Sequence, residues 1–249
     1  MIVRFERDGE VRFGVLQDEE ISVINGDIFS DYEVTNEKVS KNEVKLLAPT
    51  EPSKVVCIGL NYVDHAKELN LTLPKEPLMF IKPSTSVIGP NDDVVYPEVS
   101  SRVEYEAELA IVIGKRAKNV PKEEVNNYIL GYTVANDVTA RDIQFSDGQW
   151  TRGKSFDTFC PIGPGIVKDV DPNQLSIELS VDGVVKQKSN TNQLLFKVDE
   201  IVSYVSKMMT LLPGDVIITG TPFGVGPVEK GNTMTVTIEK IGKIVNKVI

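Results

Sequence analysis

The sequence predicts a mainly β protein with few helices, in the α+β class. Three observations predict it: short β-rich runs recur along the chain, two Asp-Gly turns each join a pair of such runs into a hairpin, and one clear amphipathic helix lies near the C-terminus. The antiparallel hairpins argue against a doubly wound parallel sheet. We expect a small N-terminal domain over residues 1–50 and a main domain over residues 51–249.

The first 50 residues are predicted to form the small β domain. Apolar and polar residues alternate over residues 3–23 around the turn at Asp8-Gly9, a pattern typical of an antiparallel meander. Residues 26–45 are polar, and the prolines that follow predict a linker to the main domain.

The main domain should begin near Lys54 with a buried strand over residues 55–59. Asn61 then provides a good N-cap for a short helix that runs to about residue 69. The helix near the C-terminus covers residues 198–211, where apolar side chains follow helical spacing until Pro213-Gly214 ends it. The other predicted elements are strands at residues 103–113, 129–137, 216–218 and 234–238, a hairpin at residues 175–188 and a helix from residue 121.

The strand over residues 103–113 carries three acidic side chains at every second position, Glu104, Glu106 and Glu108. Alternate side chains of a strand share a face, so these carboxylates should point the same way. The run then becomes wholly apolar, as in a strand that enters a core, where unpaired carboxylates are costly. A hard divalent ion, Mg²⁺, Mn²⁺ or Ca²⁺, would balance them. An edge strand with a solvated acidic face is the alternative, and this segment alone favours neither.

The strand over residues 129–137 ends on Asp137, which can supply a third oxygen ligand beside a Glu-x-Glu pair. Arg141 follows four residues later and could bind a substrate carboxylate through two hydrogen bonds. A structural ion pair of Arg141 with Asp142 or with Glu104 is the alternative.

His65 is the only histidine of the chain, so any imidazole base must be this residue. Glu68, three residues later, would share its helix face and could orient the ring; a structural or exposed histidine is the alternative. The short polar segment around them is typical of a mobile lid. Lys154 lies in a loop rich in Gly, Pro and aromatic residues, where it could stabilise negative charge on a substrate oxygen or remain a solvated lysine.

Residues 219–226 form a Gly-rich loop after a predicted strand. The loop lacks the Gly-Lys-Ser/Thr ending of a P-loop and no helix begins behind it, so we exclude a nucleotide site. A substrate-site wall made of backbone groups, or turn geometry alone, explains the glycines.

The composition excludes several classes of partner. A net charge of −9 without a basic stripe argues against nucleic acid. No run approaches the roughly 20 apolar residues that span a bilayer, so we expect no membrane partner and a cytoplasmic location. Cys57 and Cys160 lie far apart outside any Cys-x-x-Cys motif, and we expect both to be reduced and buried.

Six blocks of the main domain resemble, in order, the fumarylacetoacetate hydrolase family. They are Gly59-Leu60-Asn61-Tyr62 with His65 and Glu68, Phe80-Ile81-Lys82-Pro83, Glu104-Tyr105-Glu106-Ala107-Glu108-Leu109, residues 136–144, Gly153-Lys154-Ser155-Phe156-Asp157, and residues 213–226. The N-terminal 50 residues carry little of the resemblance.

The resemblance implies a mixed β-sandwich or roll, a homodimer, and a divalent metal ion held by Glu106, Glu108 and Asp137, with Glu104 outside the ligand set. The ion would be Mg²⁺, Mn²⁺ or Ca²⁺. The catalytic residues that the resemblance implies are His65, Glu68 and Lys154, and the implied substrate-binding residues are Tyr62, Lys82, Arg141, Gln144 and Thr221.

Members of the family that are similar to this chain act on short 2-oxo acids through an enolate. The resemblance therefore implies hydrolytic C–C cleavage of an acylpyruvate-type 1,3-dicarbonyl acid. Isomerisation of 2-hydroxyhepta-2,4-diene-1,7-dioate, as in aromatic compound catabolism, and decarboxylation of oxaloacetate are the alternatives, and the named residues do not separate them. A dimer that binds metal or ligand without turnover is the alternative outside the enzymes.

Overall fold

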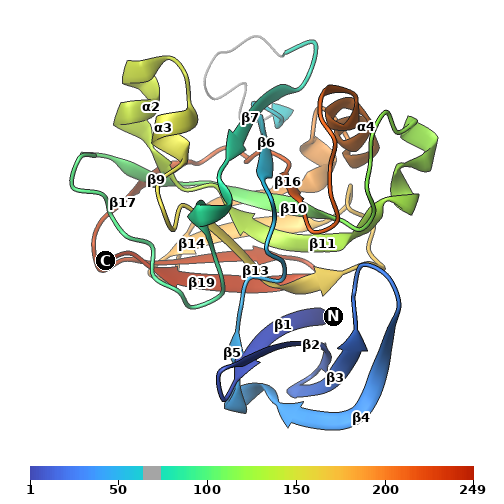
Figure 1. The fold of residues 1–249 in the computed structure, drawn as a ribbon. Coiled ribbons are helices and arrows are strands. Elements are labelled where there is room, and N and C mark those ends of the chain that lie inside the picture. Colours follow the sequence, from blue (N-terminus) through green and yellow to red (C-terminus); the bar gives the residue numbers. More distant parts are fainter. Residues whose placement is uncertain (64–73) are drawn as a thin grey trace.

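The computed structural model describes residues 1–63 and 74–249, and strands make up most of its regular structure (Figure 1). The mainly β prediction is therefore confirmed. The longest sheet has the hydrogen-bonded order β4 (Tyr32–Ser40), β3 (Glu20–Gly26), β2 (Glu10–Gln17), β1 (Ile2–Arg7), β13 (Cys160–Val167), β11 (Ile129–Asn136), β10 (Ala107–Ile113), β16 (Val216–Ile218), β6 (Val55–Gly59) and β7 (Leu78–Lys82). Two short strands join it from the side, β5 (Lys45–Leu46) on β1 and β8 (Val87–Ile88) on β13.

A second sheet has the order β15 (Val184–Asn190), β14 (Ser176–Val181), β18 (Thr233–Ile238) and β19 (Gly242–Lys247), and a small third one has the order β12 (Thr139–Ala140), β9 (Val103–Tyr105) and β17 (Gly226–Val228). Among the described residues the helices are α2 (Arg141–Asp147), α3 (Thr151–Lys154) and α4 (Val198–Met208), with 3-10 turns η1 (Lys41–Glu43), η2 (Ser84–Ser86), η3 (Lys122–Asn127) and η4 (Thr191–Gln193). Figure 1 shows β19 below β10 and β11.

The main core lies between the long sheet and the second sheet. Leu109 and Ile111 of β10, Val134 of β11, Leu179 of β14 and Val236 of β18 belong to one buried apolar cluster. Every residue of β10 is buried, which agrees with its wholly apolar second half. Burial of this kind contributes roughly 25 cal/mol per Å² of apolar surface, so the core fixes the register of the strands that carry the acidic residues.

The N-terminal meander is confirmed: β1 to β4 pair in order and surround their own apolar cluster, which includes Phe5, Ile21 and Val39. β1 joins the long sheet through the pair Ile2 and Ile166. For the polar residues 26–45 the sequence predicted no strand, but β4 lies within them. β4 is an edge strand whose side chains are mostly exposed, so it lacks the alternation that marks a half-buried strand. The domain division at residue 50 stays a prediction.

The buried apolar face predicted for the C-terminal helix is confirmed, but α4 ends at Met208 and Met209 is extended. The helix predicted from residue 121 is the 3-10 turn η3. Lys154, which we expected in a loop, ends the short helix α3. Most of the helix predicted over residues 61–69 lies outside the described residues.

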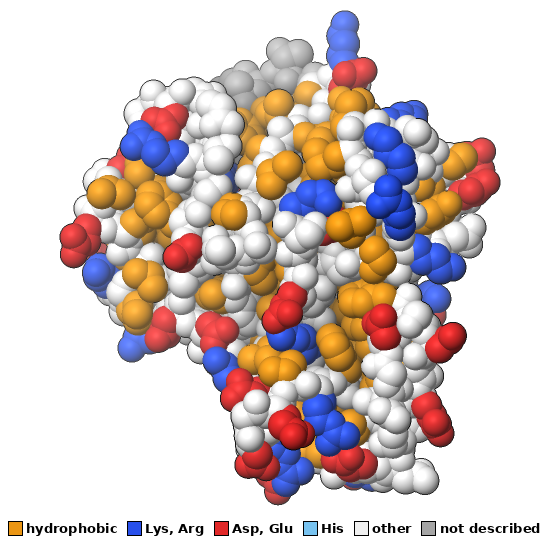
Figure 2. All heavy atoms as spheres, viewed as in Figure 1, with side chains coloured by type: hydrophobic (Ala, Val, Ile, Leu, Met, Phe, Trp, Pro, Cys, Tyr) orange, Lys and Arg blue, Asp and Glu red, His pale blue; other side chains and the backbone are white. Residues whose placement is uncertain are grey.

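The described helices include none that is long and apolar enough to cross a membrane. On the face drawn in Figure 2, most acidic and basic side chains are interspersed, and a few basic side chains lie together at the upper right. Cys57 and Cys160 are free and buried, as predicted, and burial raises the pKa of the Cys160 thiol to about 12.

Candidate active site

Three buried carboxylates come together where the acidic run over residues 103–113 changes the strands with which it pairs. Glu106 lies at the break between β9, which pairs with β12 and β17, and β10, which pairs with β11 and β16. The register of β10 on β11 places Ala107 opposite Asn136, so the glutamates on either side of Ala107 lie beside Asp137. Oxygen atoms of Glu106, Glu108 and Asp137 lie within 4.8 Å of one another. The structure thus brings together the three residues that the resemblance implied as ligands.

Cationic side chains surround two of these carboxylates. Lys154 Nζ donates to Glu106 Oε2 at 2.8 Å and to Asp137 Oδ2 at 2.7 Å. Lys82 Nζ donates to the other oxygen of Asp137, and Arg141 donates to the other oxygen of Glu106. Burial alone would raise the pKa of Glu106, but Lys154 and Arg141 outweigh it and lower this pKa to about 2. Glu106 is therefore ionised at neutral pH.

Glu108 has a different environment. Its Oε2 accepts a 2.6 Å hydrogen bond from the backbone N–H of Gly220, whose φ of +98° favours glycine. Burial, and then the negative charges of Asp137 and Glu106, raise the pKa of Glu108 well above its usual value. A divalent cation would supply the positive charge that the ionised carboxylate needs, and three carboxylates suit a hard ion. The residues present therefore fit such an ion.

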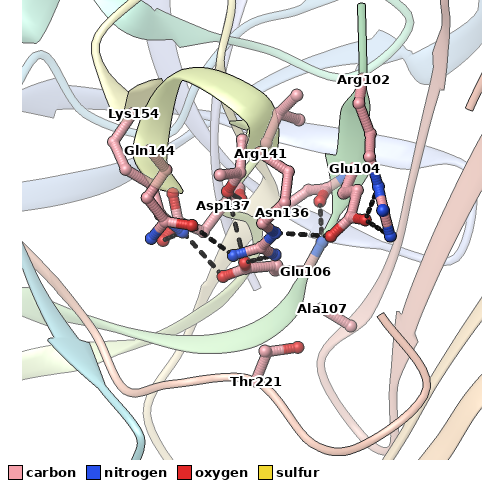
Figure 3. A network of polar contacts seen from close by, with 12 residues as sticks. Arg102, Glu104, Glu106, Ala107, Asn136, Asp137, Arg141, Gln144, Lys154 and Thr221 are labelled. Carbon is pink, nitrogen blue, oxygen red and sulfur yellow. Dashed lines mark hydrogen bonds and ion pairs between the residues drawn. The ribbon is translucent and has the colours of Figure 1, made fainter. Parts of the chain in front are cut away.

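Glu104 pairs with two arginines, one of which connects it to Glu106 (Figure 3). Its Oε2 accepts from Arg141 Nε at 2.6 Å and its Oε1 accepts from Arg102 Nε at 2.6 Å. Arg141 Nη1 donates to Gln144 Oε1 at 2.5 Å. The structural ion pair of Arg141 with Glu104, which the sequence left open, is therefore present. The Arg141 guanidinium also donates to Glu106, one of the three carboxylates Glu106, Glu108 and Asp137 that we call the acidic trio.

All three glutamates of the acidic strand line one cavity of about 410 Å³, so the prediction that they share a face is confirmed. Asp137, Lys154, Arg141 and Thr221 line it as well. Apolar side chains line the cavity as well, namely Ile58, Leu60, Phe80, Phe145, Trp150 and Val225. Phe80 and Phe145 lie beside the cationic groups of Lys154 and Arg141. A cavity lined by both charged and apolar side chains is suited to a small anion with a carbon chain.

Sequence reasoning missed the aromatic wall. Phe80 of β7 and Trp150 form an edge-to-face pair with ring centroids 5.3 Å apart, and Lys154 Nζ lies 5.1 Å from the Phe80 centroid. Gly59 leaves room for the indole, because a Cβ atom there would lie 2.6 Å from Trp150. The only tryptophan of the chain, close to Lys154 in sequence, was the available signal.

Sequence reasoning also missed Gln187, which reaches the site from the second sheet. This buried amide accepts from the backbone N–H of Ala107 at 2.9 Å and donates to Thr221 Oγ1 at 2.9 Å. It therefore links the acidic strand to the loop of Thr221. Nothing in the local sequence of β15 indicates this contact.

The structure does not place every predicted substrate-binding residue at the cavity. Tyr62, Lys82 and Gln144 are buried, and none of them is among the described residues that line it. As direct substrate contacts they stay predictions. His65 and Glu68 lie outside the described residues.

Asp142 holds the start of α2, the helix that presents Arg141. Its carboxylate accepts from Ser100 Oγ at 2.7 Å and from Ser101 N at 2.8 Å. Burial would raise its pKa, but these hydrogen bonds outweigh it and lower the pKa to about 2.

Because the folded-state pKa of Asp142 is lowered, its stabilising effect is present above the unfolded pKa of 3.8 and is lost as pH falls through about 2. We expect Asp142→Asn to lower the free energy of unfolding by about 1 kcal/mol at neutral pH, since the group is partly solvated, and by less in acid. Urea unfolding at several pH values measures this, with the exposed Asp169→Asn as control. An equal loss at every pH would contradict the assignment.

Comparison with known proteins identifies the family. The model of the fumarylacetoacetate (FAA) hydrolase C-terminal domain matches residues 54–249. The chain belongs to the fumarylacetoacetate hydrolase family. Residues 1–49 match a second model, described as Rv2993c-like, N-terminal. The resemblance drawn from the six sequence blocks is thereby confirmed.

Relatives within the fumarylacetoacetate hydrolase family carry names of different activities. The chain is 47% identical over 223 residues to the mitochondrial oxaloacetate tautomerase Fahd2a of Rattus norvegicus, covering 85% of this chain and 71% of that one. It superposes on 2-hydroxyhepta-2,4-diene-1,7-dioate isomerase from Mycobacterium marinum with a TM-score of 0.93 and 44% identity, covering 100% and 97% of the two chains. It superposes on fumarylpyruvate hydrolase from Pseudomonas aeruginosa, in complex with Mn²⁺ and pyruvate, with a TM-score of 0.76 and 34% identity, covering 86% and 92%.

Proposed function

We propose that this family member is a divalent-metal-dependent enzyme that interconverts the keto and enol forms of a short 2-oxo acid. Glu106, Glu108 and Asp137 would hold the ion, which is Mg²⁺ or Mn²⁺. The observation that carries the proposal is geometric: oxygen atoms of the three buried carboxylates lie within 4.8 Å of one another. Glu106 and Asp137 contact cationic side chains, whereas Glu108 contacts none among the described residues. A divalent ion bound there would supply Lewis-acid stabilisation of an enolate oxygen.

Lys154 adds a second source of positive charge at the cavity. Two of the three N–H bonds of its ammonium group go to Glu106 and Asp137, which leaves the third for a substrate oxygen. Burial would lower the pKa of Lys154, but Asp137 and Glu106 outweigh it and raise this pKa above 10.5. Lys154 therefore stays charged at neutral pH and can stabilise the negative charge that develops on enolisation.

The remaining walls would bind and orient the substrate. Arg141 lines the cavity with its guanidinium already fixed by Glu104, so it can orient a carboxylate at little entropic cost. Phe80 and Trp150 would pack against the carbon chain and exclude water, which strengthens the electrostatic interactions inside. His65, oriented by Glu68, stays the predicted residue for moving the proton.

Hydrolytic C–C cleavage of an acylpyruvate-type acid is the second candidate. The likeness to the fumarylpyruvate hydrolase favours it, because enolate stabilisation serves cleavage as well as tautomerisation. Cleavage further requires an activated water, and His65 is the predicted base for it. Homodimer formation and a cytoplasmic location also stay predictions.

NMR analysis of products tests the proposal. Purified protein is incubated with oxaloacetate, an acylpyruvate and a 2-hydroxydienoate, each with Mg²⁺ or with EDTA. Faster keto–enol exchange of oxaloacetate only with Mg²⁺ supports the tautomerase, whereas pyruvate plus a second acid from the acylpyruvate supports the hydrolase. No turnover of any substrate by metal-loaded protein would overturn the enzymatic proposal in favour of a binding protein.

A further inference from the structure

The acidic run breaks at Glu106, and side-chain amides bind the two backbone N–H groups at the break. The N–H of Glu106 donates to Asn136 Oδ1 at 2.9 Å, and the N–H of Ala107 donates to Gln187 Oε1 at 2.9 Å. Successive N–H groups of an extended chain point in opposite directions, so the two amides come from different strands, β11 and β15. Together they hold the backbone between Glu106 and Glu108, two of the carboxylates of the acidic trio.

The other end of the Gln187 amide contacts the loop of residues 219–226. Its Nε2 donates to Thr221 Oγ1 at 2.9 Å and to the carbonyl oxygen of Pro222 at 2.9 Å. These partners fix the orientation of the amide, because a backbone N–H only donates and a carbonyl oxygen only accepts. Oε1 must therefore face Ala107, and Nε2 must face the loop.

This orientation of the amide decides what the Thr221 hydroxyl group can do. The hydroxyl oxygen accepts from Gln187 Nε2, so the hydroxyl proton is directed to another acceptor. Thr221 also lines the cavity that contains the acidic trio. Its hydroxyl group can therefore donate to an oxygen atom of a bound 2-oxo acid.

The packing of β15 against the loop of residues 219–226 places Gln187 between the two contacts. Gln187 is fully buried, and the other residues of β15 are half-buried or exposed. Gly224 has a φ of +89°, and a Cβ atom there would collide with the carbonyl oxygen of Lys186. The loop thus lies directly against the backbone of β15, within reach of one buried amide.

From these contacts we infer that Gln187 is a positioning residue that couples the metal ligands to the loop of residues 219–226. Its Oε1 fixes the backbone between Glu106 and Glu108, and its Nε2 fixes the Thr221 hydroxyl group as a donor to a bound 2-oxo acid. This inference rests on the proposed function, since it assumes a divalent ion and a 2-oxo acid in the cavity. The competing explanation is that Gln187 only stabilises the fold.

A double-mutant cycle between Gln187 and Thr221 separates the two explanations. Isothermal titration measures Mn²⁺ binding to metal-free protein and pyruvate binding to protein saturated with Mn²⁺. The proteins are the wild type, Gln187→Met, Thr221→Val and the double variant. Asn246→Leu is the matched control, because it removes another buried amide of the second sheet, one that donates to the carbonyl oxygens of Gly89 and Asp92.

We expect Gln187→Met to weaken Mn²⁺ binding by about 10- to 100-fold in both backgrounds at residue 221, since this effect passes through Ala107. It should weaken pyruvate binding by about 10-fold when Thr221 is present. In the Thr221→Val background the loss should be less than about 2-fold, because the hydroxyl group that Gln187 positions is absent. Asn246→Leu should change neither affinity by more than about 2-fold.

An equal loss of pyruvate affinity in both backgrounds, or an unchanged Mn²⁺ affinity, would overturn the inference. If Gln187→Met does not fold, Gln187→Asn takes its place, since its amide is one methylene group too short to contact both Ala107 and Thr221. Gln187→Asn should lose at least one of the two affinities, and full retention of both would overturn the inference.

The binding test and the turnover test can fail separately. If the cycle gives the expected result but no substrate of the NMR panel turns over, the inference stands and the proposed activity fails. If the panel shows turnover but Gln187→Met has the same effect on pyruvate binding in both backgrounds, the activity stands and the inference fails. A wild type that binds no Mn²⁺ would contradict the proposed function and the inference with it.

Discussion

Replacing Glu108 with glutamine is expected to weaken binding of Mg²⁺ or Mn²⁺ by on the order of 100-fold or more and to remove turnover. Glu108 is the best choice among the three carboxylates because its contact with Gly220 is a backbone hydrogen bond, whereas Glu106 and Asp137 also hold buried lysines. A neutral amide at Glu108 therefore removes the negative charge without leaving a buried cation unpaired. Titration calorimetry of metal-free protein measures the affinity.

For the same variant we also predict its stability relative to the wild type in EDTA, which removes divalent ions. The pKa of Glu108 is raised in the folded protein, so the stabilising effect of the carboxyl group is complete below its ordinary value of 4.5 and is lost as pH rises through the raised value. Glutamine does not titrate, so in EDTA at about pH 8 Glu108→Gln should be at least as stable as the wild type. Added Mg²⁺ should then raise the Tm of the wild type much more than that of the variant.

The exposed Glu98→Gln is the control, and it should retain both the metal affinity and the rise in Tm. Wild-type metal affinity in Glu108→Gln would show that Glu108 is not a ligand and would contradict the proposed trio.

Local sequence patterns predicted the elements in which buried apolar residues recur with the spacing of a strand or a helix. The run over residues 103–113 became β9 and the buried β10, and the turn at Asp182-Gly183 joins β14 to β15. β4 was missed because an edge strand with both faces exposed needs no apolar residues. The break at Glu106 was also missed, since a change of pairing partners depends on β11 and β12, which lie 20 or more residues away.

The candidate site likewise contains residues that the sequence predicted and residues that it did not. Spacing alone gave Glu104, Glu106 and Glu108 a common face, and the family resemblance was needed to separate Glu104 from the other two. In the structure, oxygen atoms of Glu106, Glu108 and Asp137 lie within 4.8 Å of one another, and the group does not include Glu104, which pairs with Arg102 and Arg141. Phe80 and Gln187 reach the site from other strands, so their roles depend on tertiary contacts that no local pattern encodes.

Replacing Lys154 with methionine is expected to lower kcat by about 100- to 1000-fold, as for loss of one donor to a developing oxyanion. The same change leaves Glu106 and Asp137 without a shared ammonium group, so metal-free protein should lose about 3–5 kcal/mol of stability. Metal affinity should not fall, because the ammonium group competes with a divalent ion for the same two carboxylates. Kinetics, urea unfolding and titration calorimetry give the three readouts.

Lys82→Met is the matched comparison for this prediction. Lys82 is also fully buried and also pairs with Asp137, but it is not among the described residues that line the cavity. Its loss should cost stability of the same order and leave more of kcat, because its ammonium group contacts Asp137 and the Val138 carbonyl. Equal losses of kcat in the two variants would mean that both lysines act only by balancing the charge of Asp137. The assignment of Lys154 to the oxyanion would then be wrong, even if the metal site were correct.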